Sequence, residues 1–380
     1  MPRMHVRAHM IKNTALDNWV SEAEGRWTWD QMRNDRRYQD WVSFCSLVWD
    51  PSSDLLYCGV ASFTGDIFWT FDRRAATFAS LDFPSFGDQF DAKFHRSLER
   101  DGDVFYAATA LLHDPDRLQE SSGGKLLKWD ARTRQYTLLD IPVPHQYIQS
   151  LTLDRRRGIL YGATFPAEIL FRYDIAAGKS RQIAYIGAGY LMGQAEKMAV
   201  DAEGRLWGTW AEIRAWESNP GPNCIRLFCY NPDSDEMTWF GHGLPKLYAG
   251  DRGTIDTMLL ADDGLLYIGT GSGALCRLDP KTAEATLLGK PGHGRRLTGL
   301  ALGRDGRIYG VAGDCERVRV FAYDRERRAF TDFGGIFDPE IGEGPERTHD
   351  MALTDDYVVF AGENDNPRRS GFLWECQLER

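Results

Sequence analysis

The stretch that decides the fold is Leu259-Leu260-Ala261-Asp262-Asp263-Gly264-Leu265-Leu266-Tyr267-Ile268-Gly269-Thr270. Runs of β-forming residues flank its Asp-Asp-Gly turn signal, and this arrangement predicts a hairpin. Downstream, residues 275–278 predict a third strand that ends in an Asp-Pro turn, and residues 285–288 predict a fourth. The stretch therefore opens a sheet of four short antiparallel strands.

The same unit recurs along the whole chain. The second strand of each copy carries an aromatic residue at the equivalent position, and successive copies of this residue lie 42 to 60 residues apart. These aromatic residues are Tyr57, Tyr106, Tyr161, Trp207, Tyr267, Tyr309 and Phe360. Seven such units predict an all-β fold, a seven-bladed β-propeller of four-stranded antiparallel blades. A straight solenoid would need capping ends, and the sequence shows none.

The last repeat supplies only three of its four expected strands, at residues 351–353, 358–361 and 372–378. A three-stranded blade would leave a bare sheet edge, so we expect the region upstream of Trp41 to donate the missing strand. Residues 1–40 then form an N-terminal extension that packs on or closes the ring, and residues 41–380 form the propeller. The extension contains Trp27-Thr28-Trp29 and a charged run at residues 33–37.

The composition excludes several classes of function. The net charge of -10 argues against nucleic-acid binding and fits a small acidic oligosaccharide better than a long polyanion. No apolar run is long enough to span a bilayer, so we expect no membrane partner. Residues 1–7 lack an apolar signal core, which predicts a cytoplasmic protein. Seven cysteines without a Cys-x-x-Cys pair argue against a disulfide framework and a zinc knuckle. The oligomeric state stays open.

The connections between the expected strands point to one face of the ring. Short turns join the first strand to the second and the third to the fourth, and these share one face. The other connections are long and varied, as at residues 111–124 and 210–223, and they share the opposite face. Variable loops on rigid strands are where proteins place their sites, so we expect the site on this second face.

Three histidines fall on that face. His95 and His349 each lie eleven residues before the aromatic residue of their repeat, at the start of an innermost strand, and His113 opens a long loop after Tyr106. Histidine transfers protons near neutral pH, so His95 and His113 are candidate acid–base residues. In the alternative interpretation these side chains bond to the backbone or to water near the axis.

Arginines, a lysine and tyrosines add candidates on the same face. Arg214, Arg295, Arg296 and Lys197 lie at loop or strand-start positions. An arginine there can hold a carboxylate in bidentate fashion, although solvated surface charges remain the alternative. Tyr147 and Tyr190 lie in connections between repeats and can donate a phenolic proton, or can simply pack with the hydroxyl in water.

A run of oxygen-bearing side chains, Glu363-Asn364-Asp365-Asn366, follows the second strand of the last repeat. It is expected close to His349 in space. His349, Glu363 and Asn364 are thus candidate ligands of a divalent cation (Ca, Mn or Zn) near the axis. A turn rich in Asn and Asp is the alternative.

Three segments of the sequence resemble the seven-bladed polysaccharide lyases, namely the ulvan lyases and the rhamnose–glucuronate lyases. The first runs from Lys93-Phe94-His95-Arg96-Ser97-Leu98 to Tyr106, and the second is Gly158-Ile159-Leu160-Tyr161-Gly162-Ala163-Thr164-Phe165-Pro166. The third joins His349-Asp350-Met351-Ala352-Leu353, Gly362-Glu363-Asn364-Asp365-Asn366 and Arg369-Ser370-Gly371-Phe372-Leu373-Trp374-Glu375.

This resemblance implies β-elimination at a uronic acid. It matches His95 and His113 to the family's paired histidines and His349 to the histidine of the last blade, which contacts substrate. Phe165 stands where the family's catalytic tyrosine is expected. Tyr147 or Tyr190 would then replace that tyrosine, or a histidine would make both proton transfers. The arginine that neutralises the carboxylate corresponds to Arg172 or Arg181.

The sequence therefore predicts a lyase acting on a uronic-acid-containing oligosaccharide. His residues would serve as acid and base, with Arg or a cation neutralising the carboxylate. Two alternatives stay open. One is a metal-dependent lactonase or hydrolase of a sugar-like substrate. The other is a non-catalytic propeller that binds a ligand or a protein.

Overall fold

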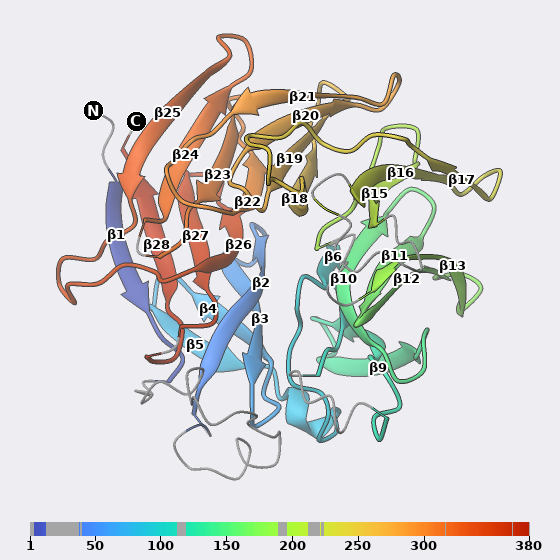
Figure 1. Cartoon of the computed structure of the whole chain (residues 1–380). Helices are drawn as coiled ribbons and strands as arrows, with labels where there is room; N and C mark the ends of the chain where they lie inside the picture. Colours follow the sequence, from blue (N-terminus) through green and yellow to red (C-terminus); the bar gives the residue numbers. More distant parts are fainter. Residues whose placement is uncertain are drawn as a thin grey trace.

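The computed structural model describes residues 4–12, 38, 40–111, 119–188, 196–211, 221, 224–315, 317–366 and 368–379. In this part of the chain, seven four-stranded antiparallel sheets stand around a ring, as Figure 1 shows. The described residues include one complete helical element, the 3-10 turn η2 (Phe83–Ser85). The predicted seven-bladed propeller is confirmed.

In blades 1 to 6 the strands follow one another from the axis outwards in chain order, and in blade 7 β1 is added as the outermost strand. Blade 1 consists of β2 (Val42–Asp50), β3 (Leu55–Ser62), β4 (Phe68–Asp72) and β5 (Thr77–Ser80). Blade 2 consists of β6 (Leu98–Asp101), β7 (Val104–Ala108), β8 (Leu126–Asp130) and β9 (Gln135–Asp140). Blade 3 consists of β10 (Tyr147–Asp154), β11 (Ile159–Phe165), β12 (Ala167–Asp174) and β13 (Lys179–Ala188). Blades 4 and 5 consist of β14 (Ala199–Val200), β15 (Leu206–Ala211), β16 (Ile225–Asn231) and β17 (Glu236–Trp239); and β18 (Ile255–Leu260), β19 (Leu266–Thr270), β20 (Leu275–Asp279) and β21 (Glu284–Gly289). Blades 6 and 7 consist of β22 (Leu297–Leu302), β23 (Ile308–Ala312), β24 (Arg319–Asp324) and β25 (Ala329–Gly335); and β26 (Thr348–Leu353), β27 (Val358–Glu363), β28 (Leu373–Leu378) and β1 (Met4–His9).

The seven repeat aromatics all lie on second strands, where they were predicted, and all are buried. They fill the space between neighbouring blades. Tyr57 of blade 1, for example, lies 4.0 Å from Phe105 of blade 2, measured between ring centroids. Burying both faces of each small sheet in this way supplies the apolar area that holds the ring together.

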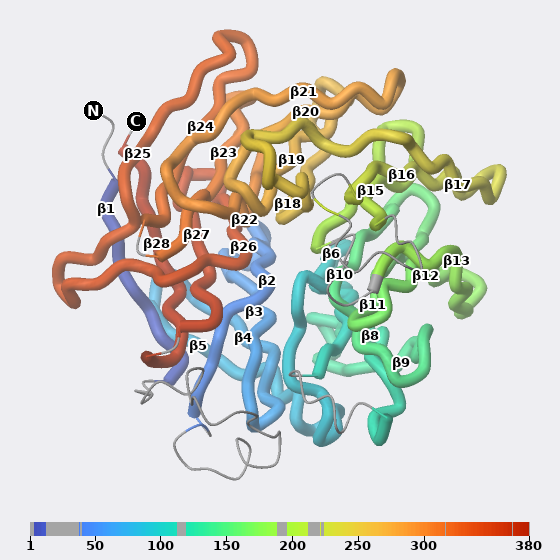
Figure 2. The backbone as a smooth tube through the Cα atoms, viewed as in Figure 1, coloured from blue at the N-terminus to red at the C-terminus, as the bar shows by residue number. Residues whose placement is uncertain are grey.

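The ring closes in blade 7, where β1 becomes the fourth strand. It pairs antiparallel with β28, from Met4 opposite Leu378 to His9 opposite Leu373. Val6 of β1 packs in one apolar cluster with Trp374 of β28. Figure 2 shows the two ends of the chain at this same blade. The expected donation of a strand from upstream of Trp41 is confirmed, whereas residues 27–29 and 33–37 lie outside the described residues.

Among the described residues, none of the helical structure has the length and apolar character needed to cross a membrane.

Candidate functional site

The first strands of five blades carry a β-bulge at the same level of the ring. Each bulge leaves one residue out of the pairing with the second strand, and such a residue is re-aimed by the local bend. The five axial bulge residues are Cys45, Gln149, Asp256, Thr298 and His349. Each of them takes part in the polar cluster described below, so the bulges are the local device that builds the site.

Two of these bulges orient a pair of histidines. The Nδ1 atom of His349 lies 3.0 Å from the carbonyl oxygen of Cys45, and Nδ1 of His95 lies 2.9 Å from that of Gln149. A carbonyl only accepts, so Nδ1 carries the proton in each neutral ring, and Nε2 is the basic atom. The two rings meet edge to face, 4.5 Å apart between centroids. The predicted convergence of His95 and His349 is therefore present.

Burial holds the pKa of His349 well below its usual range, and the positive charges of Arg96, His95 and Arg296 act in the same direction. The imidazole is consequently neutral at pH 7. Nε2 of the neutral histidine is therefore free to accept a proton, while the burial and the positive charges that lower its pKa also make it a weaker base.

Glu196 joins the two histidines. Its Oε2 atom lies 3.7 Å from Nε2 of His349, 3.2 Å from Nε of Arg96 and 3.4 Å from Nη2 of Arg296. Ligand atoms of His95, Glu196 and His349 all lie within 4.8 Å of one another. Sequence reasoning missed Glu196, which lies in the connection before β14 and belongs to none of the recognised runs.

Arg96 crosses the axis beneath this group. Its side chain is 3% exposed, and its Nη1 atom donates a 2.8 Å hydrogen bond to the carbonyl of Thr298, in blade 6. Arg296 in turn pairs with the carboxylate of Asp256 at 3.0 Å. Groups from several blades are thereby joined at the centre, and the charges of the two guanidinium groups are balanced by Glu196 and Asp256.

Above these groups lies a polar pocket of about 460 Å³. We call it the axial pocket. It is lined by Lys93, His95, Glu196, Thr254, Asp256, Gly271, Arg295, Arg296, Asp314, Arg347, His349, Asn364 and Asp365. Its residues come from the long connections and from the starts of first strands, so the pocket lies on the face where a site was expected.

Tyr147 lies next to the axial pocket and does not line it. The phenol ring is buried against Phe165, with centroids 5.2 Å apart, and lines a smaller neighbouring cavity. Burial raises the pKa of Tyr147 well above its usual value, and the negative charge of Glu196 adds to the effect. The hydroxyl therefore keeps its proton, which suits a proton donor and excludes a phenolate base at neutral pH.

Three predicted substrate-binding residues lie away from this pocket. Arg172 on β12 and Arg181 on β13 both bond to the hydroxyl of Tyr230, and Arg181 also pairs with Asp235. Lys197 pairs with Glu99 at 2.7 Å and donates to the carbonyl of Leu151. Spacing along the sequence did not separate these structural ion pairs from a binding role, because repeats place similar residues in inner and outer strands.

The predicted metal set is only partly assembled. Glu363 is 0% exposed, and its carboxylate accepts hydrogen bonds from the main-chain N–H groups of Glu346 and Phe372 and from the side chains of Asn366 and Arg369. It does not line the axial pocket, so the inclusion of Glu363 is corrected. His349 and Asn364 do line the pocket. His113, Tyr190 and Arg214 lie outside the described residues.

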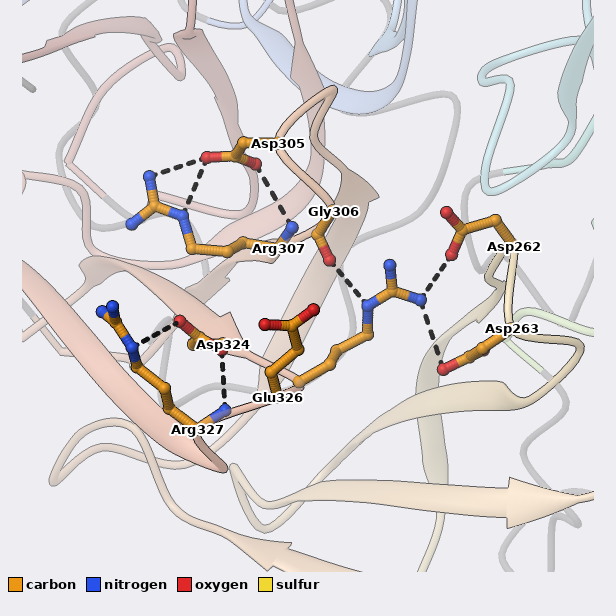
Figure 3. A pocket seen from close by; sticks show the side chains of 9 residues that line it. Asp262, Asp263, Asp305, Gly306, Arg307, Asp324, Glu326 and Arg327 are labelled. Atoms are coloured by element: carbon orange, nitrogen blue, oxygen red, sulfur yellow. Dashed lines mark hydrogen bonds and ion pairs between the residues drawn. The ribbon is translucent and has the colours of Figure 1, made fainter.

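A second hollow, of about 730 Å³, lies at the short turns of blades 5 and 6, on the other face (Figure 3). Its arginines pair with neighbouring aspartates. Arg325 pairs with Asp262 and Asp263, and Arg307 pairs with Asp305 at 2.7 Å. These groups hold adjacent turns together, so we place the candidate site in the axial pocket.

Comparison with known proteins was informative at the level of fold. No protein-family model matches the chain, and no curated protein matches it in sequence. One similar solved structure is the extracellular domain of the putative one component system BT4673 from B. thetaiotaomicron, with 12% identity and a TM-score of 0.59 over 88% of this chain and 38% of that one. A second structure of the BT4673 extracellular domain is similar as well. This chain spans about two fifths of the length of each of these two BT4673 chains.

Two further similar structures are lyases. The structure of streptogramin B lyase has 10% identity and a TM-score of 0.62 over 99% of this chain and 98% of that one. Selenomethionine-substituted virginiamycin B lyase from Staphylococcus aureus has 10% identity and a TM-score of 0.63 over 99% and 100%. These structures are not polysaccharide lyases, and identities this low show the fold alone. What the comparisons and the sheet order establish together is that the chain is a seven-bladed β-propeller.

Proposed function

We propose that this propeller is a carbon–oxygen lyase that cleaves a uronic-acid-containing oligosaccharide by β-elimination in the axial pocket. The observation that carries the proposal is the pair of histidines, His95 and His349, which meet in a pocket beside Glu196. The resemblance of the sequence to uronate lyases supports the choice of substrate. The similar structures include lyases and the extracellular domain of a one component system, so they favour no single chemistry.

In the proposed reaction, Nε2 of the neutral His349 takes the proton from C5, the carbon next to the carboxylate. The electrons of that C–H bond form the C4=C5 double bond while the C4–O bond breaks. The protonated Tyr147 beside the pocket, or a His95 that enters the reaction as the imidazolium with a second proton on Nε2, gives a proton to the departing oxygen. Negative charge develops on the carboxylate in the transition state, so a positioned cation is required for useful rates.

The proposal is tested by following the unsaturated uronide in the ultraviolet while the enzyme acts on oligosaccharides that contain glucuronate. The variants His95→Gln and His349→Gln should each lose about 10²–10⁴-fold in turnover, the usual value of a positioned acid or base. His5→Gln is the matched control, because its side chain is exposed on β1. Full activity in both pocket variants, or the absence of unsaturated product from every such substrate, would overturn the proposal.

A second candidate function is favoured by one specific observation, the clustering of His95, Glu196 and His349 within 4.8 Å. Two imidazoles and a carboxylate suit Zn²⁺ or Mn²⁺ better than Ca²⁺, which prefers oxygen ligands. Metal-binding histidines usually donate their other ring N–H to a carbonyl or carboxylate, as both histidines do here. Such an ion would supply Lewis acidity for a lactonase or hydrolase.

Chelation separates the two candidates. A lyase that uses only side chains should keep forming the unsaturated product after EDTA treatment. A metal-dependent hydrolase should release saturated sugars and lose activity until Zn²⁺ or Mn²⁺ is returned. A non-catalytic propeller would show saturable binding of the sugars and would form neither product.

A further inference from the structure

The axial pocket contains one buried cation whose charge is not balanced by the described protein. Lys93 lines the pocket and is 6% exposed. Among the residues that the structure describes, its Nζ atom has no carboxylate at ion-pair distance and makes no hydrogen bond. Nζ makes a cation–π contact with the ring of Tyr147, at 5.9 Å from the ring centroid. A cation that lines a pocket without a carboxylate partner can bind an anionic ligand without breaking an ion pair, so an anion is expected at this position when the pocket is filled.

The backbone holds Lys93 firmly in this position. Its main chain bridges Ala61 of blade 1 and Ala110 of the loop that leaves blade 2, and its N–H donates to the carbonyl of Ala110. The region that the ammonium group can reach is therefore set by the fold, because the side chain starts from a fixed point between two blades.

Three of the four other cationic groups near the pocket are already matched, and the fourth, Arg295, is exposed to solvent. Arg296 pairs with Asp256 and Glu196, and Arg96 shares Glu196 from below. Arg347 lies 3.7 Å from Asp365. An anionic ligand would have to compete with these carboxylates for the three paired arginines, whereas at the buried residue Lys93 it would meet no described competitor.

A second unsatisfied group lies in the same pocket. Asn364 is 5% exposed, and its Oδ1 atom has no hydrogen-bond partner among the described residues, while its Nδ2 atom lies 3.5 Å from Sγ of Cys45. Buried polar atoms in native proteins are nearly always hydrogen-bonded. A ligand that fills the pocket should therefore bring a donor, such as a hydroxyl group, to this oxygen.

We propose that Lys93 and Asn364 form the recognition subsite for a hydroxylated carboxylate, with the Lys93 ammonium binding the carboxylate and Asn364 Oδ1 accepting a hydrogen bond from a hydroxyl group. This assignment deepens the proposed function, and the choice of a sugar acid rests on it. Lys93 then also supplies the positive charge that β-elimination requires at the carboxylate. In this assignment Lys93, rather than an arginine, is the residue that distinguishes an acidic sugar from a neutral one.

The test uses methyl β-D-glucuronide and methyl β-D-glucoside, which differ at C6 and carry no sugar leaving group at C4. Binding is measured by calorimetry or saturation-transfer NMR. The wild-type protein should bind the glucuronide about 10–100-fold more tightly than the glucoside, the usual value of a hydrogen bond to a charged group. Lys93→Met should abolish this preference, Lys93→Arg should restore part of it, and Asn364→Leu should weaken both sugars.

The matched control is Lys281→Met, which removes an exposed lysine at the short-turn face. If Lys93→Met does not fold, Lys93→Gln takes its place. The inference is overturned if the wild type binds neither sugar, if it does not prefer the glucuronide, or if Lys93→Met keeps the preference.

The outcome is independent of the chemistry. A preference that depends on Lys93, without unsaturated product from any oligosaccharide, would leave the subsite standing and reject the lyase. If the wild type forms the unsaturated product but Lys93→Met binds the glucuronide as tightly as the wild type does, the lyase assignment stands and the subsite is rejected.

Discussion

The imidazole rings of His95 and His349 lie 4.5 Å apart, and each is fixed by a main-chain carbonyl rather than by a carboxylate. Because those carbonyls belong to the bulges at Gln149 and Cys45, the orientation of the pair depends on the geometry of two further blades. The pair is thus a property of the closed ring.

The first prediction concerns the effect of pH on stability. In the folded protein, burial and the neighbouring Arg96, His95 and Arg296 lower the pKa of His349 far below the ordinary value of 6.5. Below that pH the unfolded chain binds a proton that the folded chain does not. The free energy of unfolding should therefore fall as the pH drops below about 6.5, by up to about 1.4 kcal/mol per pH unit from this group.

This prediction is checked by denaturant unfolding between pH 5 and 8 in buffer that contains a chelator. His349→Gln should show a shallower loss of stability on acidification. Asp350, whose pKa is raised by burial, acts in the opposite direction in both proteins, so the comparison between them cancels its effect. Parallel pH profiles for the two proteins would refute the assignment of a neutral His349.

The second prediction concerns Glu196, which lies at the centre of the charge cluster. Glu196→Gln leaves the buried guanidinium of Arg96 without its carboxylate and should lower the free energy of unfolding by about 3 kcal/mol. The double variant Arg96→Met/Glu196→Gln should recover part of that loss. Chemical denaturation measures both effects.

Glu203→Gln is a suitable control for this prediction, because the Glu203 side chain is half exposed and lies 3.6 Å from Arg205. Its stability should stay within about 0.5 kcal/mol of the wild type. If Glu196→Gln behaved in the same way as this control, the balance of charges at the axis would be misassigned.

The third prediction concerns the closure of the ring. Val6 is buried in the cluster that joins β1 to β28, so Val6→Ala should lower the free energy of unfolding by about 2 kcal/mol. Arg7→Ala, on the exposed side of the same strand, should change it little. Equal effects of the two changes in thermal or chemical unfolding would contradict the role of β1 as an integral strand.

The fold was predictable because its signal is repeated. Each aromatic such as Tyr267 must pack between blades, so the chemistry of one position recurs at a steady spacing. His95 and His349 were found for the same reason, since both precede their repeat aromatic by the same distance. The periodic part of the site was therefore visible in the sequence.

The remainder of the site depends on features that have no such pattern. Glu196 lies in an irregular connection, and a β-bulge at Asp256 or Thr298 leaves no mark in the sequence. Glu363 was included because its neighbours are oxygen-rich, yet Arg369, six residues further on, takes up its carboxylate. Lys93 was overlooked as a binding residue because the feature that marks it is the lack of a nearby carboxylate. That feature is visible only when the three-dimensional packing is known.

The pairing of β1 with β28 has a mechanical consequence. The two strands run antiparallel, with Met4 opposite Leu378 at the end of the pair from which both chain ends depart. A force that pulls the chain ends apart would load the backbone hydrogen bonds one after another, as in unzipping, instead of all together in shear. The seam in blade 7 should therefore be the first part of the ring to yield under tension, while the six blades built from continuous chain remain intact.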